Sequence, residues 1–208
     1  MKKVFEYWLP DTDVHFEKMI SKRVSKGGPA EYQDDTRDEV YKFVKDFDTV
    51  VDVGANVGFW AKPLAKKFKR VIAFEPMQQV YECLELNTQG LNVDINKFAL
   101  GEQNSTVNII YNEENTGAST VDTNSYNNGN ITIKTLDSLN LPKFGLLKVD
   151  CERFDLHVLK GAEQTILKYK PIIVVEQHPD TDYEAGAYLK SLGAKVLSNV
   201  RKDYIFGW

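Results

Sequence analysis

The fold of this 208-residue chain is decided by residues 50–60, which read Val50-Val51-Asp52-Val53-Gly54-Ala55-Asn56-Val57-Gly58-Phe59-Trp60. An apolar strand ends in this stretch at an acidic residue, a turn with two glycines follows, and helix-forming sequence comes next. Glycine lets the backbone of such a turn lie close to a ligand, because no Cβ stands in the way. The pattern is typical of the first strand, loop and helix of a nucleotide-binding βαβ unit.

A second apolar strand also ends in a carboxylate. It reads Val71-Ile72-Ala73-Phe74-Glu75-Pro76, and parallel sheets bind their ligands beyond the carboxyl ends of the strands. A carboxylate at that place can accept hydrogen bonds from both ribose hydroxyls of an adenosine-bearing cofactor, so we predict that Glu75 binds ribose. Two interpretations of Asp52 stay open. Either it orients the loop or contacts the cofactor through water, or its role is purely structural.

The composition limits the class of protein. The chain has a formal net charge of −4 and no basic stripe, so duplex nucleic acid is not expected as a partner. Two cysteines, Cys83 and Cys151, are too few for a disulfide framework. We find neither a signal-peptide pattern nor an apolar run of membrane-spanning length. These features predict a globular protein of the cytoplasm, with no membrane or nucleic-acid partner.

Strands and helices alternate along the middle of the chain. Apolar runs predict strands at 49–53, 70–74, 93–98, 145–149 and 171–176. Apolar residues at helical spacing predict helices near 39–44, 57–68, 77–89, 155–168 and 183–192. Pro63 is expected to kink or break the helix in which it falls. Strands separated by helix-length segments imply a parallel sheet with right-handed crossovers.

One stretch departs from this alternation. Residues 107–111 and 131–134 have the period of half-buried strands, which predicts an inserted β-hairpin near 106–135. The segment 112–130 between them is rich in Asn, Gly, Ser and Thr. It is long for a loop of a compact domain, so we expect it to be either functional or mobile.

The two ends of the chain have different patterns. The predicted strands at 194–198 and 203–208 are joined by a link that is too short for a crossover, so they form an antiparallel hairpin. Residues 1–30 are mixed and polar. We interpret them as an N-terminal extension with little regular structure of its own, or with a short helix near 14–21. Residues 31–208 are expected to form one domain.

These segments together match a known family. Over residues 31–208 the chain resembles the FkbM family of S-adenosylmethionine-dependent methyltransferases. The matching blocks are Asp52–Phe59, Phe74–Pro76, Asn96–Gly101, Leu147–Glu152 with Val158–Ala162, and Lys170–Glu176. The resemblance implies an α/β, Rossmann-like class I methyltransferase fold, whose mostly parallel seven-stranded sheet ends in an antiparallel C-terminal hairpin. It also implies S-adenosylmethionine as the cofactor.

The resemblance assigns cofactor contacts to strand ends and to the segment that flanks adenine. The residues are Asp52, Gly54, Ala55, Asn56, Gly58, Phe59, Glu75, Pro76, Phe98, Ala99 and Asp150. The chain departs from the family after the acidic pair of the fourth strand, where the family usually has glycine and then another acid. Arg153 replaces the glycine and Asp155 stands for the later acid. This departure bears on the acceptor more than on the cofactor.

Two pairs of ionisable residues follow the fourth and fifth strands. Asp150 and Glu152 stand two residues apart, as do Glu176 and His178, so each pair shares one face of an extended chain. We predict that Glu152, Glu176 and His178 are catalytic, with His178 as general base or substrate contact. Alternatively, the first pair is an acidic helix N-terminus. The four side chains could hold a divalent cation, but no tight ligand spacing demands one, so we expect no metal.

The expected reaction is O-methylation of a small, sugar-like or polyol acceptor, as the resemblance implies. A nicotinamide-dependent oxidoreductase is one alternative, although Asn56 and the lack of a further glycine after Gly58 argue against that cofactor. A scaffold that binds S-adenosylmethionine without catalysis is another. A nucleic-acid methyltransferase fits the acidic composition poorly, and the sequence does not indicate an oligomeric state.

Overall fold

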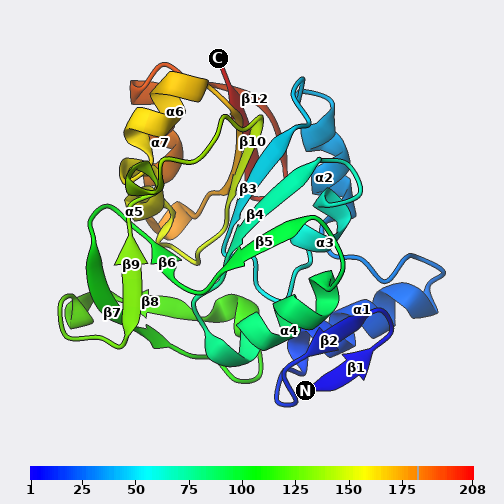
Figure 1. Ribbon diagram of the computed structural model, residues 1–208. Coiled ribbons are helices and arrows are strands. Elements are labelled where there is room, and N and C mark those ends of the chain that lie inside the picture. The colour runs from blue at the N-terminus through cyan, green and yellow to red at the C-terminus, as the bar shows by residue number, and fades with distance from the viewer. Residues whose placement is uncertain (182) are drawn as a thin grey trace.

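The computed structural model describes residues 1–181 and 183–208. A seven-stranded sheet forms its centre (Figure 1). Its strands, in spatial order, are β12 (Lys195–Val200), β13 (Asp203–Gly207), β11 (Ile172–Glu176), β10 (Leu146–Val149), β3 (Thr49–Val53), β4 (Arg70–Phe74) and β5 (Val93–Asn96). Neighbours from β11 to β5 pair in parallel, and β13 pairs antiparallel with β11 and β12. This confirms the predicted mostly parallel sheet and its antiparallel C-terminal hairpin.

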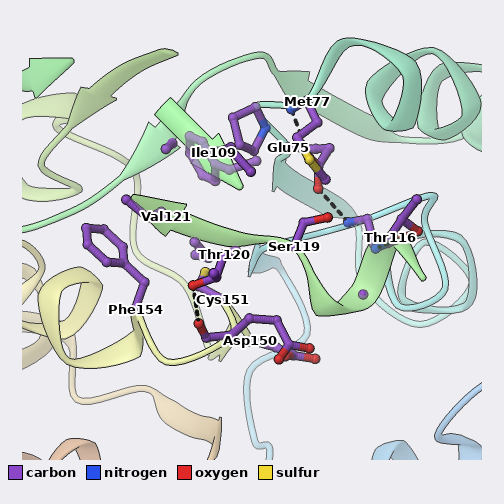
Figure 2. A pocket seen from close by; sticks show the side chains of 18 of the residues that line it. Glu75, Met77, Ile109, Thr116, Ser119, Thr120, Val121, Asp150, Cys151 and Phe154 are labelled. Atoms are coloured by element: carbon purple, nitrogen blue, oxygen red, sulfur yellow. Dashed lines mark hydrogen bonds between the residues drawn. The ribbon is translucent and has the colours of Figure 1, made fainter. Parts of the chain in front are cut away.

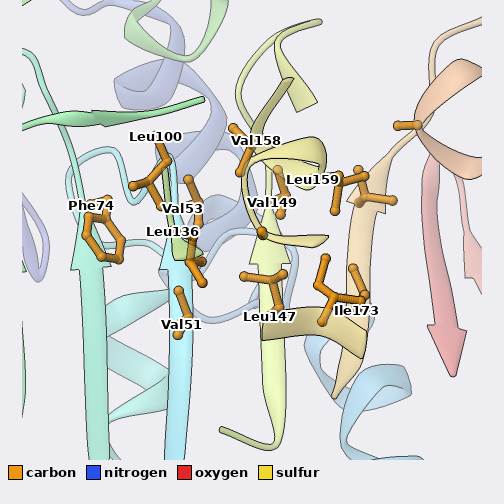
Figure 3. Packing of buried hydrophobic residues seen from close by; sticks show 14 of the residues in the cluster. Val51, Val53, Phe74, Leu100, Leu136, Leu147, Val149, Val158, Leu159 and Ile173 are labelled. Atoms are coloured by element: carbon orange, nitrogen blue, oxygen red, sulfur yellow. The ribbon is translucent and has the colours of Figure 1, made fainter. Parts of the chain in front are cut away.

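Helices cover both faces of this sheet (Figure 1). One face carries α2 (Asp34–Tyr41), α3 (Ala61–Leu64) and α4 (Gln78–Thr88), and the other carries α5 (Asp155–Lys160), α6 (Glu163–Tyr169) and α7 (Glu184–Ser191). Because side chains alternate along a strand, β3 sends Val51 and Val53 to the second face and Val50 to the first. Figure 3 shows Val51, Val53 and Leu147 on the second face, where the cluster includes Val158 of α5.

Two of the predicted helices differ from the structure. The helix expected at 57–68 contracts to the four residues of α3, because turns precede it and Pro63 lies within it. The single helix expected at 155–168 is wrong, since α5 and α6 are separate helices that break at Gly161. A Cβ on Gly161 would lie 1.9 Å from the carbonyl oxygen of Gly101, so this turn packs directly on another backbone segment. Tertiary packing therefore overrides the local helical pattern there.

The inserted region builds a second, four-stranded sheet. Its strands, in spatial order, are β6 (Ala99–Leu100), β9 (Ile131–Lys134), β7 (Ser105–Ile110) and β8 (Thr120–Asp122), with short 3-10 turns η1 (Thr116–Ala118), η2 (Thr123–Ser125) and, further along the chain, η3 (Asp137–Leu139). The antiparallel pairing of β7 and β9 confirms the two predicted strands. The segment expected to be a loop contributes β8, which pairs antiparallel with β7. A three-residue strand has too short a pattern to be found from sequence.

The first thirty residues have more regular structure than expected. They form the hairpin β1 (Lys2–Val4) and β2 (Tyr7–Leu9), followed by α1 (His15–Ser25). The prediction of little regular structure is wrong, whereas the alternative of a helix near 14–21 covers the first part of α1. Buried side chains such as Leu9 and Ile20 share a core cluster with Val80 of α4. The amide of Asn87 also accepts a hydrogen bond from the backbone of Trp8, at 2.7 Å.

None of the helices in the described residues combines the length and the apolar character that crossing a membrane requires.

Candidate functional site

A cavity opens at the carboxyl ends of β3, β4, β10 and β11 (Figure 2). The chain leaves β3 toward β4 on one side and returns later to β10 on the other, so this is the switch point at which doubly wound sheets bind ligands. Three parts of the chain line it. They are the strand ends, the inserted sheet through residues such as Ile109, Ser119 and Thr120, and the N-terminal region through Phe16, Tyr32 and Gln33.

The loop after β3 is held by backbone contacts on both sides. Gly54 has a φ of 71°, and a Cβ there would lie 2.0 Å from the carbonyl oxygen of Asp150, so only glycine fits. The amides of Gly54 and Ala55 donate to the carbonyl oxygen of Phe74, at 3.1 and 3.0 Å. These bonds fix the loop across the ends of β3 and β4, and Gly54 and Asn56 face the cavity.

Lys148 of β10 also holds the loop after β3. The sequence analysis did not predict a role for this residue. Its Nζ donates to the carbonyl oxygen of Gly54 at 2.8 Å and lies 3.3 Å from Oδ1 of Asp52. Burial alone lowers the pKa of Lys148, but Asp52 and Asp150 together raise it above its usual value. Burial raises the pKa of Asp52, and Lys148 opposes that shift. The sequence signal was a lysine inside the otherwise apolar strand β10.

Asp52 itself lies outside the cavity. Its side chain is fully buried next to Lys148 and is not among the lining residues. Of the two interpretations raised from the sequence, this placement favours the structural one. The carboxylate balances the charge of the lysine that holds the cofactor loop.

Glu75 ends the next strand and faces the cavity with its carboxylate fixed. Oε2 accepts the N–H of Asn56 at 3.0 Å, and Oε1 accepts the N–H of Met77 at 2.9 Å (Figure 2). The residue is 4% exposed, and burial raises the pKa of its carboxyl to about 7 against the effect of the two N–H donors. An ionised carboxylate has about four acceptor positions, so two remain for a ligand.

The cavity wall next to Glu75 is apolar. Phe98 and Ala99 line it together with Phe74 and Phe154, and the rings of Phe74 and Phe98 meet edge to face with centroids 5.4 Å apart. Aromatic and aliphatic side chains of this kind bind a planar heterocycle through its faces. The wall therefore suits the adenine that the family resemblance implies beside this segment.

The insert closes over the cavity and is tied to the N-terminal region. Asp13, fully buried, accepts hydrogen bonds from the Oγ1 and the backbone N–H of Thr116, at 2.7 and 3.0 Å. Thr120 donates to the carbonyl oxygen of Glu152 at 3.0 Å. Figure 2 shows Ser119 and Thr120 between Glu75 and Asp150. The long segment predicted to be functional or mobile is therefore held at both sides of the cavity.

The end of the cavity near β10 and β11 is acidic. Burial, together with the carboxylates of Asp150 and Glu176, raises the pKa of Glu152 to about 8. Burial and Asp150 likewise raise the pKa of Glu176. His178 lies behind Glu176, with Nε2 3.1 Å from Oε2 of that residue, and burial lowers the pKa of its imidazole. The predicted catalytic residues are therefore neighbours in space.

The backbone at Arg153 explains why the family usually has glycine at this position. Glu152 and Arg153 have φ values of 47° and 72°, so two successive residues lie in the left-handed region that favours glycine. The glycine usual at the position of Arg153 in the family thus has a conformational reason. The Arg153 side chain forms an ion pair with Asp180, at 2.8 Å.

The structure separates the predicted site residues into two groups. Those that line the cavity are Gly54, Asn56, Glu75, Pro76, Phe98, Ala99, Asp150, Glu152 and Glu176. Those that lie behind its surface are Asp52, Ala55, Gly58, Phe59 and His178. Gly58 packs on α4, where an added Cβ would lie 3.0 Å from Leu84, and the Phe59 ring packs against Phe16.

Sequence reasoning missed Phe16, Tyr32 and Gln33, which approach the cavity from the N-terminal region. No local pattern distinguishes them, because their position depends on contacts between distant parts of the chain. Of the three, Phe16 lies in residues 1–30, the predicted extension, whereas Tyr32 and Gln33 begin the predicted domain.

A parallel sheet with an antiparallel β13, a glycine turn after β3 and a buried acid after β4 define a class I, Rossmann-like methyltransferase. The model of the family described as methyltransferase FkbM domain matches residues 52–202. The chain belongs to this family and is an S-adenosylmethionine-dependent methyltransferase. Family membership favours methyl transfer over the oxidoreductase and scaffold alternatives.

Three known proteins show how far the likeness extends. Hexuronic acid methyltransferase AglP of Haloferax volcanii is 28% identical over 171 residues, which cover 77% of this chain and 70% of that protein. The structure of an FkbM methyltransferase from Methylobacillus flagellatus KT has a TM-score of 0.53 at 18% identity, covering 77% of this chain and 43% of that one. A precorrin-6y C5,15-methyltransferase from Geobacter metallireducens GS-15 has a TM-score of 0.53 at 13% identity, covering 98% and 94%. These two structures support the fold alone.

Proposed function

We propose that this methyltransferase transfers a methyl group to a hydroxyl oxygen of a small, sugar-like acceptor. The observation that carries the proposal is the pair of carboxylates, Glu152 and Glu176, in the same cavity as the fixed carboxylate of Glu75. A hydroxyl acceptor must lose a proton as it is methylated, and this cavity places proton acceptors beside a nucleoside-type site. The similarity to a hexuronic acid methyltransferase supports the sugar-like class of acceptor.

The residues of β3 and β4 fit the cofactor. We assign the two free acceptor positions of Glu75 to the ribose hydroxyls and the Phe98–Ala99 wall to adenine. Gly54 and Asp150 would then lie at the methionine end, where the acidic side chains suit the cofactor's positive sulfonium and ammonium groups. When bound, S-adenosylmethionine supplies an electrophilic methyl group.

The acidic end of the cavity would serve the acceptor. During methyl transfer the hydroxyl proton would pass to the group made by Glu152, Glu176 and His178. The lowered pKa of His178 leaves its imidazole neutral at pH 7 and able to take up a proton. A positioned base of this kind contributes about 10²–10⁴-fold to the rate. Alignment of the acceptor by the cavity contributes separately.

Methyl transfer to a defined panel of acceptors tests this proposal. The full chain is incubated with radiolabelled S-adenosylmethionine and with glucuronic acid, galacturonic acid, their glycosides and neutral hexoses. We expect labelled product from at least one hexuronic acid, and the label should resist mild alkali, because a methyl ether survives treatment that cleaves a methyl ester.

The outcome depends on the position and chemistry of the label. An alkali-labile label would show a carboxylate acceptor and contradict hydroxyl methylation. Transfer to amines with none to sugars would contradict the acceptor class. Glu176→Gln should abolish most turnover while the affinity for S-adenosylhomocysteine stays close to that of the unchanged chain, and Glu102→Gln, outside the cavity, is the matched control.

A further inference from the structure

The side chains of Glu152, Glu176 and His178 converge on one point at the acidic end of the cavity. One carboxylate oxygen from each glutamate and one ring nitrogen of the histidine lie within 4.8 Å of one another. Their spacing along the sequence does not by itself bring them together. Glu176 ends β11 and Glu152 follows β10, and these neighbouring parallel strands end at the same edge of the sheet.

His178 provides an independent observation. It is 6% exposed, and its Nε2 has no hydrogen-bond partner among the described residues, although Oε2 of Glu176 lies 3.1 Å away. Leaving a buried nitrogen without a partner is unfavourable, and native structures usually explain each such atom by a ligand, an ion or a water. His178 belongs to the same group of potential ligand residues as the two glutamates.

Lys202, Lys148 and Arg153 all lower the pKa of Glu176 by their charge, yet burial and Asp150 still raise it. Among the described residues, Nζ of Lys202 lies 4.0 Å from Glu176, on a largely exposed side chain. Arg153 is engaged by Asp180 instead, at 2.8 Å. Like charges held close together in a partly buried site favour a bound cation.

We propose that Glu152, Glu176 and His178 bind one divalent cation, of the Mg²⁺ or Mn²⁺ type, at the acceptor end of the cavity. Two carboxylate oxygens and one imidazole nitrogen form a ligand set suited to these ions. Both glutamates line the cavity, so the remaining coordination positions face the space where an acceptor would lie. This departs from the sequence-based expectation of no metal, which rested on ligand spacing along the chain.

The cation gives the acceptor site two properties. It would lower the pKa of an acceptor hydroxyl bound to it, as a catalytic metal does for bound water, so with the cation in place the proton passes to solvent and the three side chains act as ligands in place of a base. It also gives an anionic acceptor a partner in an otherwise acidic cavity. This role rests on the proposed function, whereas the binding of the cation does not.

Binding of Mn²⁺ alone tests the proposal. The full chain is freed of metal with a chelator, the chelator is removed, and MnCl₂ is added while free Mn²⁺ is measured by electron paramagnetic resonance. We expect one Mn²⁺ per chain, displaced by excess Mg²⁺. Loss of an outer-shell partner usually weakens metal binding about 10- to 100-fold, so losing a direct ligand in Glu176→Gln or His178→Ala should weaken it at least about tenfold.

A control variant, a third ligand variant and a folding check complete the experiment. Glu102→Gln alters a carboxylate that also lies next to a histidine, His157 at 3.2 Å, and should leave Mn²⁺ binding unchanged. Glu152→Gln tests the site from a different strand end, and circular dichroism shows whether each variant is folded. No binding by the unchanged chain at millimolar Mn²⁺, or equal binding by the folded variants, would overturn the cation site. Methyl transfer to the acceptor panel by the unchanged chain tests the proposed function separately, because Mn²⁺ binding is measured without cofactor or acceptor.

Discussion

The two halves of the cavity are held in different ways. In the cofactor half, at the ends of β3 and β4, Glu75 accepts two backbone N–H groups and Lys148 donates to the backbone of Gly54. In the acceptor half, at the ends of β10 and β11, Nε2 of His178 has no partner among the described residues, and Glu152 has left-handed backbone. Hydrogen bonds with the backbone fix the first half without a ligand, although Asp52, like His178, has an ion-pair contact but no hydrogen-bond partner among the described residues, and Asn56, like Glu152, has left-handed backbone.

The difference suggests separate roles for the two halves, one binding the cofactor and the other binding the acceptor. A cofactor common to a family needs a fixed shape, and satisfied hydrogen bonds provide it by removing alternative conformations. Unpartnered polar groups and backbone strain persist where a ligand completes them. The following predictions test whether the two halves differ as this interpretation requires.

The largest effect is expected for Lys148→Met, under the cofactor half. The variant leaves the fully buried Asp52 without its partner, and breaking a buried ion pair on one side costs about 3–5 kcal/mol of stability. Urea unfolding measures this change. Replacing both residues, as Lys148→Met with Asp52→Leu, should recover much of the loss. A single variant as stable as the unchanged chain would show that this pair does not support the loop.

Asp13→Ala tests the tie between the N-terminal region and the insert. The buried carboxylate accepts two hydrogen bonds from Thr116, and losing bonds to a charged acceptor costs about 1.5–3 kcal/mol. The same urea experiment applies. Asp122→Ala, a more exposed aspartate of the insert that accepts one backbone N–H, should cost about 1 kcal/mol or less. Equal losses for the two variants would contradict a special role for Asp13.

The pH dependence of cofactor binding tests the state of Glu75. Its pKa is raised to about 7 by burial, and ribose hydroxyls donate best to the ionised carboxylate. Affinity for S-adenosylhomocysteine should therefore fall as pH drops below 7, by up to about tenfold per pH unit, and level off above 7. Calorimetric titration between pH 6 and 8 measures it. Glu75→Gln should remove the dependence, and a dependence that persisted in this variant would implicate another group.

The smallest effect is expected for Arg153→Gly. Glycine relieves about 1–2 kcal/mol of strain from the left-handed backbone at this position. Two effects oppose this gain. Glycine increases the conformational entropy of the unfolded chain, and the variant loses an exposed ion pair worth about 0–1 kcal/mol. The free energy of unfolding should therefore change by about 1 kcal/mol or less. Asp180→Asn measures the ion-pair part alone. A loss well beyond this range would show that Arg153 has a further structural role.

The contrast between the two halves also separates the features that could be predicted from the sequence from those that could not. The cofactor half is made by short segments with strong local patterns, so the turn at Gly54 and the acid at Glu75 were predicted together with the parallel strands around them. Lys148 had a visible signal, a lysine in an apolar strand, but its partners Asp52 and Gly54 are known only from the pairing of β10 with β3.

The remaining features depend on contacts that no local pattern reveals. Asp13 and Thr116 are 103 residues apart, and β8 is three residues long. The convergence of Glu152 with His178 requires β10 and β11 to end together, which the predicted parallel sheet allowed but did not fix at ligand distance. Sequence analysis therefore placed these two residues in one cleft and named them among four side chains that could hold a cation, but it expected no metal because no spacing along the chain demanded one.

Titration of S-adenosylhomocysteine into Glu75→Gln, beside Glu152→Gln, tests the central claim that the end of β4 holds the cofactor's ribose. Loss of a hydrogen bond to a charged group is worth about 1.5–3 kcal/mol, so Glu75→Gln should bind about 10- to 100-fold more weakly. Glu152→Gln, in the acceptor half, should stay within about threefold of the unchanged chain. Unchanged affinity in Glu75→Gln, with or without a loss in Glu152→Gln, would contradict this account.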